Sequence, residues 1–165
     1  MQLFVLDRCP VNSAMYLADV HVIKMCLETA QILSSVMAIK GLPLFEGAPK
    51  AYSTRHPVIS AIDTQEKLNW VLSHNFALHV EFIYRFHKQH KYFKLARNYI
   101  DTLSTIEQVA EEVSPEGLAR DFKDFITTKE DIVEAHRDYY KFKKSIIKRW
   151  KYTKREEPDW LREES

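Results

Sequence analysis

Three side chains that could do chemistry lie close together near the N-terminus, on one face of a predicted helix. His21, Lys24 and Glu28 are spaced by three and four residues, and successive helical residues turn by about 100°, so they form one narrow polar stripe. The rest of this helix is mostly apolar. An imidazole, an ammonium and a carboxylate that converge can recognise a phosphate or a base edge, or they can transfer protons. We predict that this polar stripe faces a cleft; the alternative is that it faces water.

A second set of polar side chains follows the next long predicted helix. Its members share one face by their spacing, and they are Trp70, His74, Glu81 and Arg85. We expect His74, Glu81 and Arg85 to face the polar stripe across the cleft and to bind the ligand, with Trp70 beside them. The alternative is a solvated face that a neighbouring helix partly covers. His56, directly before Pro57, is a further candidate for ligand binding.

The last predicted helix is strongly basic. From Arg137 to Arg155 the chain holds nine Lys or Arg residues and a single acid, with aromatic residues interleaved. Such a strip can bind phosphates and stack on bases, or it can bury its aromatic residues while the lysines coat the outer face. Arg137, Tyr140 and Lys143 recur at steps of three, so we expect them to supply part of an anion-binding surface.

Composition limits the remaining classes of function. The formal net charge is +1 at pH 7, so any nucleic-acid surface must be local. The seven histidines combine with no Cys or Asp set at a familiar zinc spacing, and we expect neither a metal nor a cofactor. The two cysteines, Cys9 and Cys26, are far apart and suit free thiols in a reducing compartment.

The elements that must position these side chains are predicted to be helices. Only three glycines occur in 165 residues, which suits an all-α fold better than a turn-rich β fold. We expect one helical domain over residues 1–165, with two long helices and a basic C-terminal helix. The apolar run at residues 2–6 is interpreted either as one short strand or as an extended arm. The helices are predicted over residues 12–40, 63–92, 95–113, 115–126 and 128–150.

The connections and ends carry their own signals. Residues 41–56 hold two glycines and two prolines, which predicts a long loop. Asp63 and Glu66 resemble a capping box, and Pro57 suits a first helical position. The charged tail at 154–165 is predicted to be partly frayed, although its Pro-Asp-Trp triplet resembles a docking segment. The start lacks the basic stretch of a signal peptide, and no run of about 18 apolar residues is visible, so we expect a cytoplasmic protein without a membrane partner.

Five segments of the chain resemble a family of small, uncharacterised proteins that are common in tailed bacteriophages. The segments are FVLD at 4–7, HVIKMCLETAQIL at 21–33, HP at 56–57, NWVLSHNFALHVEFIYRFHKQHK at 69–91 and HRDYYKFKKSIIKRW followed by PDW at 136–160. The similarity covers most of the chain. It implies a phage-encoded protein in the cytoplasm of the host cell, and it brings no assigned activity.

A fainter similarity is to the pyrimidine-dimer DNA glycosylases, which are small helical repair enzymes of phages. The chain is similar to them in size, in helical build and in an N-terminal arm that leads into a polar helix. Those enzymes use an amine exposed by removal of the initiator Met, together with a Glu on the first helix. The resemblance implies that Glu28 corresponds to this Glu.

Two classes of function follow, and a third is weaker. In the first, the protein binds a nucleotide or a nucleotide-derived small molecule in a polar cleft, as a phage accessory factor that sequesters a host defence signal. In the second, it is an enzyme that acts on DNA or nucleotides, with Glu28 and His21 in acid–base roles. The third is a protein-interaction module. We favour binding because no complete catalytic constellation is visible. Nucleic acid and a second copy of the chain stay open as partners.

Overall fold

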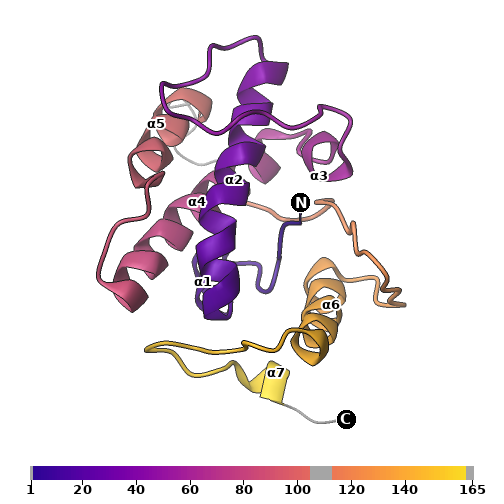
Figure 1. Ribbon diagram of the computed structural model, residues 1–165. Coiled ribbons are helices and arrows are strands. Elements are labelled where there is room, and N and C mark those ends of the chain that lie inside the picture. Colours follow the sequence, from indigo (N-terminus) through magenta and orange to yellow (C-terminus); the bar gives the residue numbers. More distant parts are fainter. Residues whose placement is uncertain (1, 105–112, 163–165) are drawn as a thin grey trace.

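The computed structural model describes residues 2–104 and 113–162, and within these ranges the regular elements are all helices (Figure 1). The all-α class predicted from the sequence is confirmed. The seven helices in the described ranges are α1 (Pro10–Met15), α2 (Asp19–Ile39), α3 (Pro57–Ser60), α4 (Gln65–Phe86), α5 (Phe93–Leu103), α6 (Ile132–Ile146) and α7 (Asp159–Arg162).

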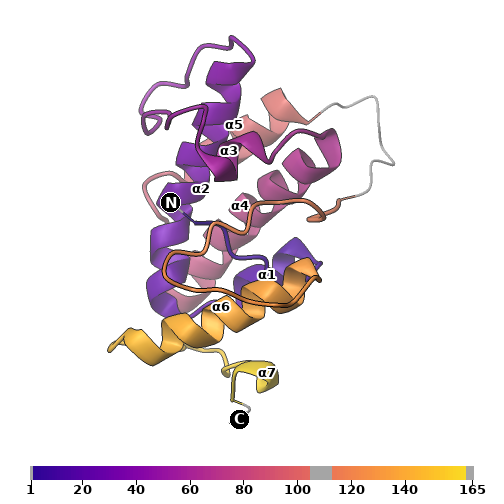
Figure 2. The same ribbon diagram turned by 90° about the vertical axis from the view of Figure 1, so that its right-hand side faces the viewer.

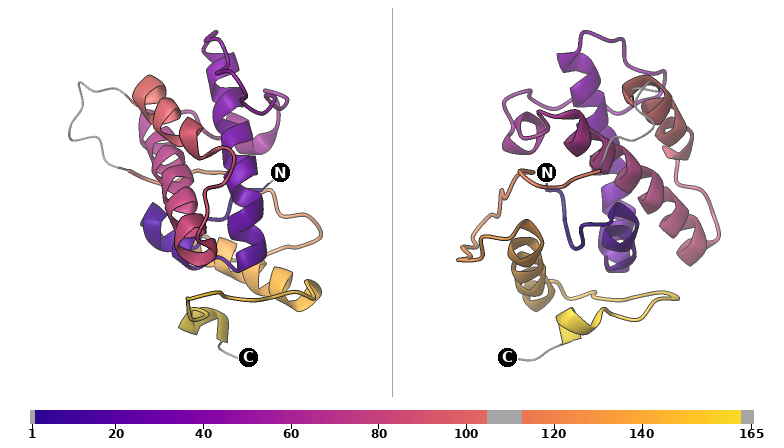
Figure 3. Two further views of the ribbon diagram at one scale, coloured as in Figure 1. Left: turned by 60° about the vertical axis from the view of Figure 1, so that its left-hand side comes forward. Right: turned by 180° about the vertical axis from the view of Figure 1, so that it is seen from behind.

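The centre of the fold is the packing of α2 against α4, with α5 beside both helices and α1 against α4 (Figures 1 and 3). Residues on nearly every side of α2 are buried, among them Met25, Ile32 and Leu33. A helix that is apolar on most sides belongs in a core, which is where α2 lies. α6 lies next to the N-terminal end of α2, in the lower part of the view and above α7 (Figure 2).

α2 also satisfies a simple test for a membrane span. It is 21 residues long, and the mean hydropathy of its most apolar window is 1.5. The sequence analysis had predicted no apolar run long enough to span a membrane. However, 67% of that window is buried inside the protein. A core helix passes the same test, so this observation is weak evidence for a membrane, and the absence of a membrane partner stays a prediction.

The N-terminal arm, residues 2–9, is buried over residues 3–6 and forms no strand within the described ranges. Of the two interpretations of residues 2–6, the extended arm is therefore correct and the strand is wrong. Side chains satisfy its backbone instead of a neighbouring strand. Val5 N donates to Nδ1 of His136 over 3.2 Å, and Leu6 N donates to the Ser13 hydroxyl over 2.9 Å. Residues 3–6 are each at most 3% exposed, so the arm is part of the core between α2 and α6.

One predicted helix start is confirmed, since Pro57 is the first residue of α3, whereas others are displaced, as in α6, which begins at Ile132 instead of 128. His56 Nδ1 accepts from Val58 N at the start of α3, and the Asp131 side chain accepts from Glu134 N at the start of α6. The cap of α4 is Thr64, one residue beyond the predicted Asp63. α4 ends at Phe86 rather than at 92, because residue 87 takes a left-handed conformation with φ of 56°.

Three helix predictions are wrong. The single helix predicted over 12–40 is divided into α1 and α2 by a turn at 16–18, and α6 ends at Ile146 instead of 150. No helix forms over 115–126; Phe122 in this segment stacks on Tyr139 with ring centroids 4.5 Å apart. The predicted helix over 95–113 corresponds to α5, and its part from 105 to 112 lies outside the described residues.

The C-terminal tail is packed on the protein as far as residue 162, so the prediction that it frays from 154 is wrong over that range. It passes beneath the lower ends of α1 and α2 (Figure 1). Tyr152 Oη donates to Tyr16 O over 2.6 Å, and Thr153 N donates to Asp19 Oδ1 over 2.9 Å. Trp160, in the predicted docking segment, lies 4.9 Å from the Arg137 guanidinium.

Candidate functional site

A polar pocket of about 150 Å³ lies where the N-terminal arm, α2, α6 and the segment before α6 meet. We call it the lysine pocket. Its lining residues are Gln2, Lys24, Glu28, Asp121, Lys123, Tyr139 and Lys143. Lys24, Glu28 and Lys143 were predicted from the sequence as ligand-binding residues, and the fold brings these three together.

Positive charge is in excess in the lysine pocket, because three lysines face two carboxylates. Lys24 Nζ lies 3.7 Å from Glu28 Oε1, which is a loose ion pair. Lys143 makes no ion pair with any residue in the described ranges, and its pKa is lowered by burial and by the neighbouring charge of Lys24. Glu28 opposes this shift without cancelling it. An anion between the two ammonium groups would supply the missing charge.

Glu28 and Gln2 give the lysine pocket its acceptors. Glu28 is 9% exposed and lies one helical turn beyond Lys24 on α2. Gln2 Oε1 is buried and accepts no hydrogen bond from the described residues. A hydroxyl or an N–H group of a ligand could satisfy this oxygen.

His21 lies in the core and does not line the lysine pocket. It is 3% exposed, and its ring packs among Phe4, Tyr140 and Trp150. Burial lowers the pKa of His21 to about 3, and the charges of Lys143 and Lys24 add to this effect. The imidazole is therefore neutral, and its Nδ1 shares a hydrogen bond of 2.8 Å with Tyr140 Oη.

The predicted polar stripe is thus divided between two environments. Lys24 and Glu28 line the lysine pocket, where the Glu28 side chain is 11% exposed and the Lys24 side chain remains 60% exposed to water. His21 instead lies under the aromatic side chains of α6 and the tail. Tyr140 Oη also accepts from Ala18 N over 2.8 Å. His21 and Tyr140 therefore form a buried link between the start of α2 and α6.

His56 adjoins the lysine pocket from α3. Its Nε2 lies 3.9 Å from Asp121 Oδ2, while its Nδ1 is occupied by the cap of α3. Asp121 lines the lysine pocket, so His56 can influence the site through this carboxylate.

Trp70 and His74 hold the N-terminal segment and do not face the polar stripe. Trp70 Nε1 donates to Arg8 O over 2.8 Å, and His74 Nδ1 donates to Pro10 O over 2.9 Å. The two rings stack with centroids 4.7 Å apart, and both residues are fully buried. Burial lowers the pKa of His74 to about 4, so it is neutral.

Glu81 and Arg85 belong to a closed cluster with Asp19 and Arg155, which we call the ion network. Arg85 lies at its centre: its Nε donates to Glu81 Oε1 over 2.9 Å, and its Nη1 donates to Asp19 Oδ1 over 3.0 Å. Arg155 Nε donates to the same Glu81 oxygen over 2.8 Å. Glu81 and Arg85 therefore join the tail to α4, and the expectation that they face the polar stripe across a cleft is wrong.

The expected anion-binding face of α6 is only partly present. Arg137 Nε donates to Leu6 O over 2.8 Å, and its guanidinium packs over the Trp160 ring, so it ties the arm to the tail. Tyr140 is fully buried. Of these residues, Lys143 alone lines the lysine pocket.

Sequence reasoning missed four lining residues, namely Gln2, Asp121, Lys123 and Tyr139. The segment that carries Asp121 and Lys123 was predicted to be a helix, and nothing in its local pattern relates it to α2. Its stacking on α6 decides its position, and that contact is not visible in the spacing of residues.

No group of three or more His, Cys, Asp or Glu residues in the described ranges is arranged to bind a metal ion. Comparison with known protein families, with curated proteins and with solved structures found no match to the chain.

Proposed function

We propose that this protein binds a phosphate-bearing small molecule, a nucleotide in the simplest case, with the phosphate in the lysine pocket. The observation that carries this proposal is the half-buried ammonium of Lys143, which lacks an anionic partner in the described ranges and lies beside a second lysine. A phosphate oxygen bound by Lys143 and Lys24 gains charge-assisted hydrogen bonds, which are stronger than hydrogen bonds between neutral groups.

The size of the lysine pocket supports binding of part of a ligand. Its volume of about 150 Å³ is small beside the roughly 300–1,000 Å³ of pockets that enclose drug-sized ligands. A phosphate or diphosphate group suits this space, and the nucleoside would extend outward from it. Gln2 Oε1 at the edge can accept a hydrogen bond from a ligand hydroxyl.

The geometry favours binding over catalysis. An acid–base pair of Glu28 and His21 would need both side chains to reach the substrate, but His21 is buried and its Nδ1 is occupied by Tyr140. With the phage resemblance, sequestering of a nucleotide-derived defence signal is the biological role that we propose.

Titration of the protein with ATP, ADP and pyrophosphate in a calorimeter tests this function. We expect binding, with Lys143→Gln weakening it by about tenfold or more, since a charge-assisted hydrogen bond contributes roughly 1.5–3 kcal/mol. Lys141→Gln is the matched control, because Lys141 is an exposed lysine on the same helix that does not line the lysine pocket. Equal effects of the two variants, or recovery of a chemically altered nucleotide, would contradict the proposal.

A second candidate is a nucleic-acid surface on the basic strip formed by α6 and the segment that follows it. Lys141, Lys148, Arg149 and Lys151 are all exposed, and none forms an ion pair within the described ranges. Binding of duplex DNA would depend steeply on salt, and each single change would matter little. Weak dependence on salt together with a large effect of Lys143→Gln would instead indicate the lysine pocket.

A further inference from the structure

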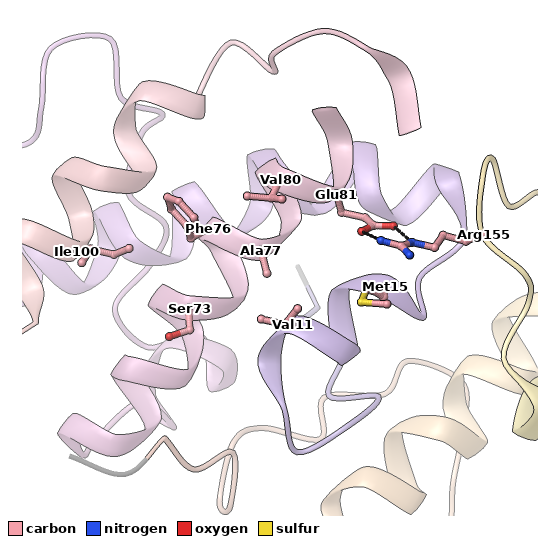
Figure 4. Close-up of a pocket in the computed structure, with 9 residues that line it drawn as sticks. All are labelled: Val11, Met15, Ser73, Phe76, Ala77, Val80, Glu81, Ile100 and Arg155. Carbon is pink, nitrogen blue, oxygen red and sulfur yellow. Dashed lines mark hydrogen bonds and ion pairs between the residues drawn. The ribbon is translucent and has the colours of Figure 1, made fainter. Parts of the chain in front are cut away.

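A second cavity, larger than the lysine pocket and apolar, lies between α1, α4 and α5 (Figure 4). Its volume is about 370 Å³, within the range of pockets that bind small molecules. We call it the apolar groove. Its lining residues are Val11, Met15, Ser73, Phe76, Ala77, Val80, Glu81, Ile100 and Arg155.

Apolar side chains on the walls of the groove remain open to solvent. Val11 is 50% exposed, Phe76 37% and Val80 49%, although each lies beside the others around one hollow. The small side chain of Ala77 forms the floor between Phe76 and Val80, and this leaves the space unfilled (Figure 4). Concave apolar surface of this kind is stabilised when a ligand removes it from water.

One end of the groove is polar, and its charge is already balanced. Figure 4 shows Glu81 and Arg155 joined there by two hydrogen bonds, with Arg155 reaching in from the tail. Behind them Arg85 and Asp19 complete the ion network, so two acids meet two bases. A ligand with a net charge would disturb this balance, whereas a neutral ligand would not.

Arg155 retains hydrogen-bond donors toward the groove. Its guanidinium has five N–H groups, and the bonds to Glu81 use only Nε and Nη2, so Nη1 donates to nothing in the described ranges. Glu81 already accepts three hydrogen bonds, from Arg85 Nε, Arg155 Nε and Arg155 Nη2. The polar end can therefore donate more readily than it can accept.

From these observations we infer that the apolar groove is a binding site for a neutral, mostly apolar small molecule that carries a hydrogen-bond acceptor, such as a carbonyl oxygen, at its Arg155 end. This site is separate from the lysine pocket and does not depend on the function proposed there. Because Arg155 belongs to the tail, the bound ligand would also contact the tail, and it would strengthen the docking of the tail on α4.

Prodan is a suitable probe, because it is a neutral naphthalene with one ketone and its fluorescence reports an apolar environment. We expect saturable binding with a blue shift of its emission, and weaker binding of the anionic anilinonaphthalene sulfonate. Ala77→Leu, which fills the floor, should weaken Prodan binding by about tenfold, because the larger side chain occupies space that the ligand needs. Lys143→Gln should leave Prodan binding unchanged.

Val80→Ser and Ile39→Ser form a matched pair that does not depend on the fold tolerating a larger residue at 77. Both remove an exposed apolar side chain from a long helix, but Ile39 lies outside the groove. Binding that falls in Val80→Ser alone supports the site, and equal effects in the two variants overturn it. Sedimentation at several protein concentrations gives the remaining outcome: a dimer that Val80→Ser dissociates would show that a second copy covers the groove, and the proposal would be wrong.

Discussion

The ion network and the lysine pocket each combine two carboxylates with basic groups, but the two clusters differ in their balance of charge. In the ion network two carboxylates meet two guanidiniums, and Arg85 is fully buried at its centre. In the lysine pocket three ammonium groups meet two carboxylates, and the one ion pair among these lining residues, Lys24 with Glu28, is 3.7 Å long. The charges of the first arrangement balance one another, whereas those of the second leave an excess of positive charge.

This difference indicates what each cluster is for. A buried charge is costly unless it is paired and hydrogen-bonded, so a closed network is needed to keep Arg85 inside the fold. A half-buried lysine without an anionic partner does not stabilise the folded protein. We therefore interpret such a lysine as a candidate for ligand binding. Balance of charge therefore separates a structural cluster from a candidate site more clearly than residue type does.

Removal of Arg85 should have the largest effect of any change that tests this comparison. Arg85→Ala leaves Glu81 and Asp19 without their central partner, and it removes the bonds to Leu17 O and Met15 O. We expect the free energy of unfolding to fall by roughly 3–5 kcal/mol, the usual cost of breaking a buried ion pair. Urea denaturation followed by circular dichroism measures this change.

Arg97→Ala is the control for this measurement. Arg97 forms an ion pair with Asp101 at the same spacing of four residues, but its side chain is 75% exposed. Exposed pairs of this kind contribute about 0.3–0.5 kcal/mol. If the two variants lose similar stability, Arg85 does not hold the fold in the way its contacts indicate.

A smaller effect is expected in the lysine pocket. Lys143→Met removes a half-buried charge that lacks an anion, so the free energy of unfolding should stay within about 0.5 kcal/mol of the original value or rise above it. We also expect bound sulfate to raise the melting temperature of the original protein but not that of Lys143→Met, because a ligand stabilises only a protein that binds it. Loss of stability by more than 2 kcal/mol, on the scale of a core residue, would show that Lys143 is structural.

Sequence spacing predicted the parts of the molecule that depend on local chemistry. Gly41 follows the end of α2 with φ of 70°, a conformation that glycine adopts easily because it has no Cβ. Pro57 begins α3, where its fixed φ suits the first helical position. The turn at 16–18 had no such signal. There Ala18 N donates to Tyr140 Oη and Asp19 N donates to Lys151 O, so residues more than 120 positions away decide where α2 begins.

The same distinction applies to the candidate site. A helical period correctly placed Lys24 and Glu28 on one face, but it also placed His21 there, in a position that aromatic side chains of α6 and the tail cover. Helical spacing gives the direction of a side chain from its own axis, and it does not give what packs against it. Asp121 and Lys123 were missed because their segment, predicted to be a helix, is irregular, and its position depends on its contacts with α6.

The smallest effect expected is the pH dependence of anion binding, and it separates Lys143 from the histidines. The pKa of Lys143 is lowered in the free protein by burial and by Lys24, and a bound anion favours its protonated form. Affinity for sulfate should therefore be constant below this lowered pKa and fall as the pH rises through it, earlier than for an ordinary lysine. His21, with a pKa held at about 3, stays neutral from pH 8 to pH 6 and should add no pH dependence there. Thermal shifts in sulfate, compared with chloride at equal ionic strength, measure this profile. If the shift grows between pH 8 and pH 6 and survives in Lys143→Met, an imidazolium binds the anion, and the lysine pocket is not the site.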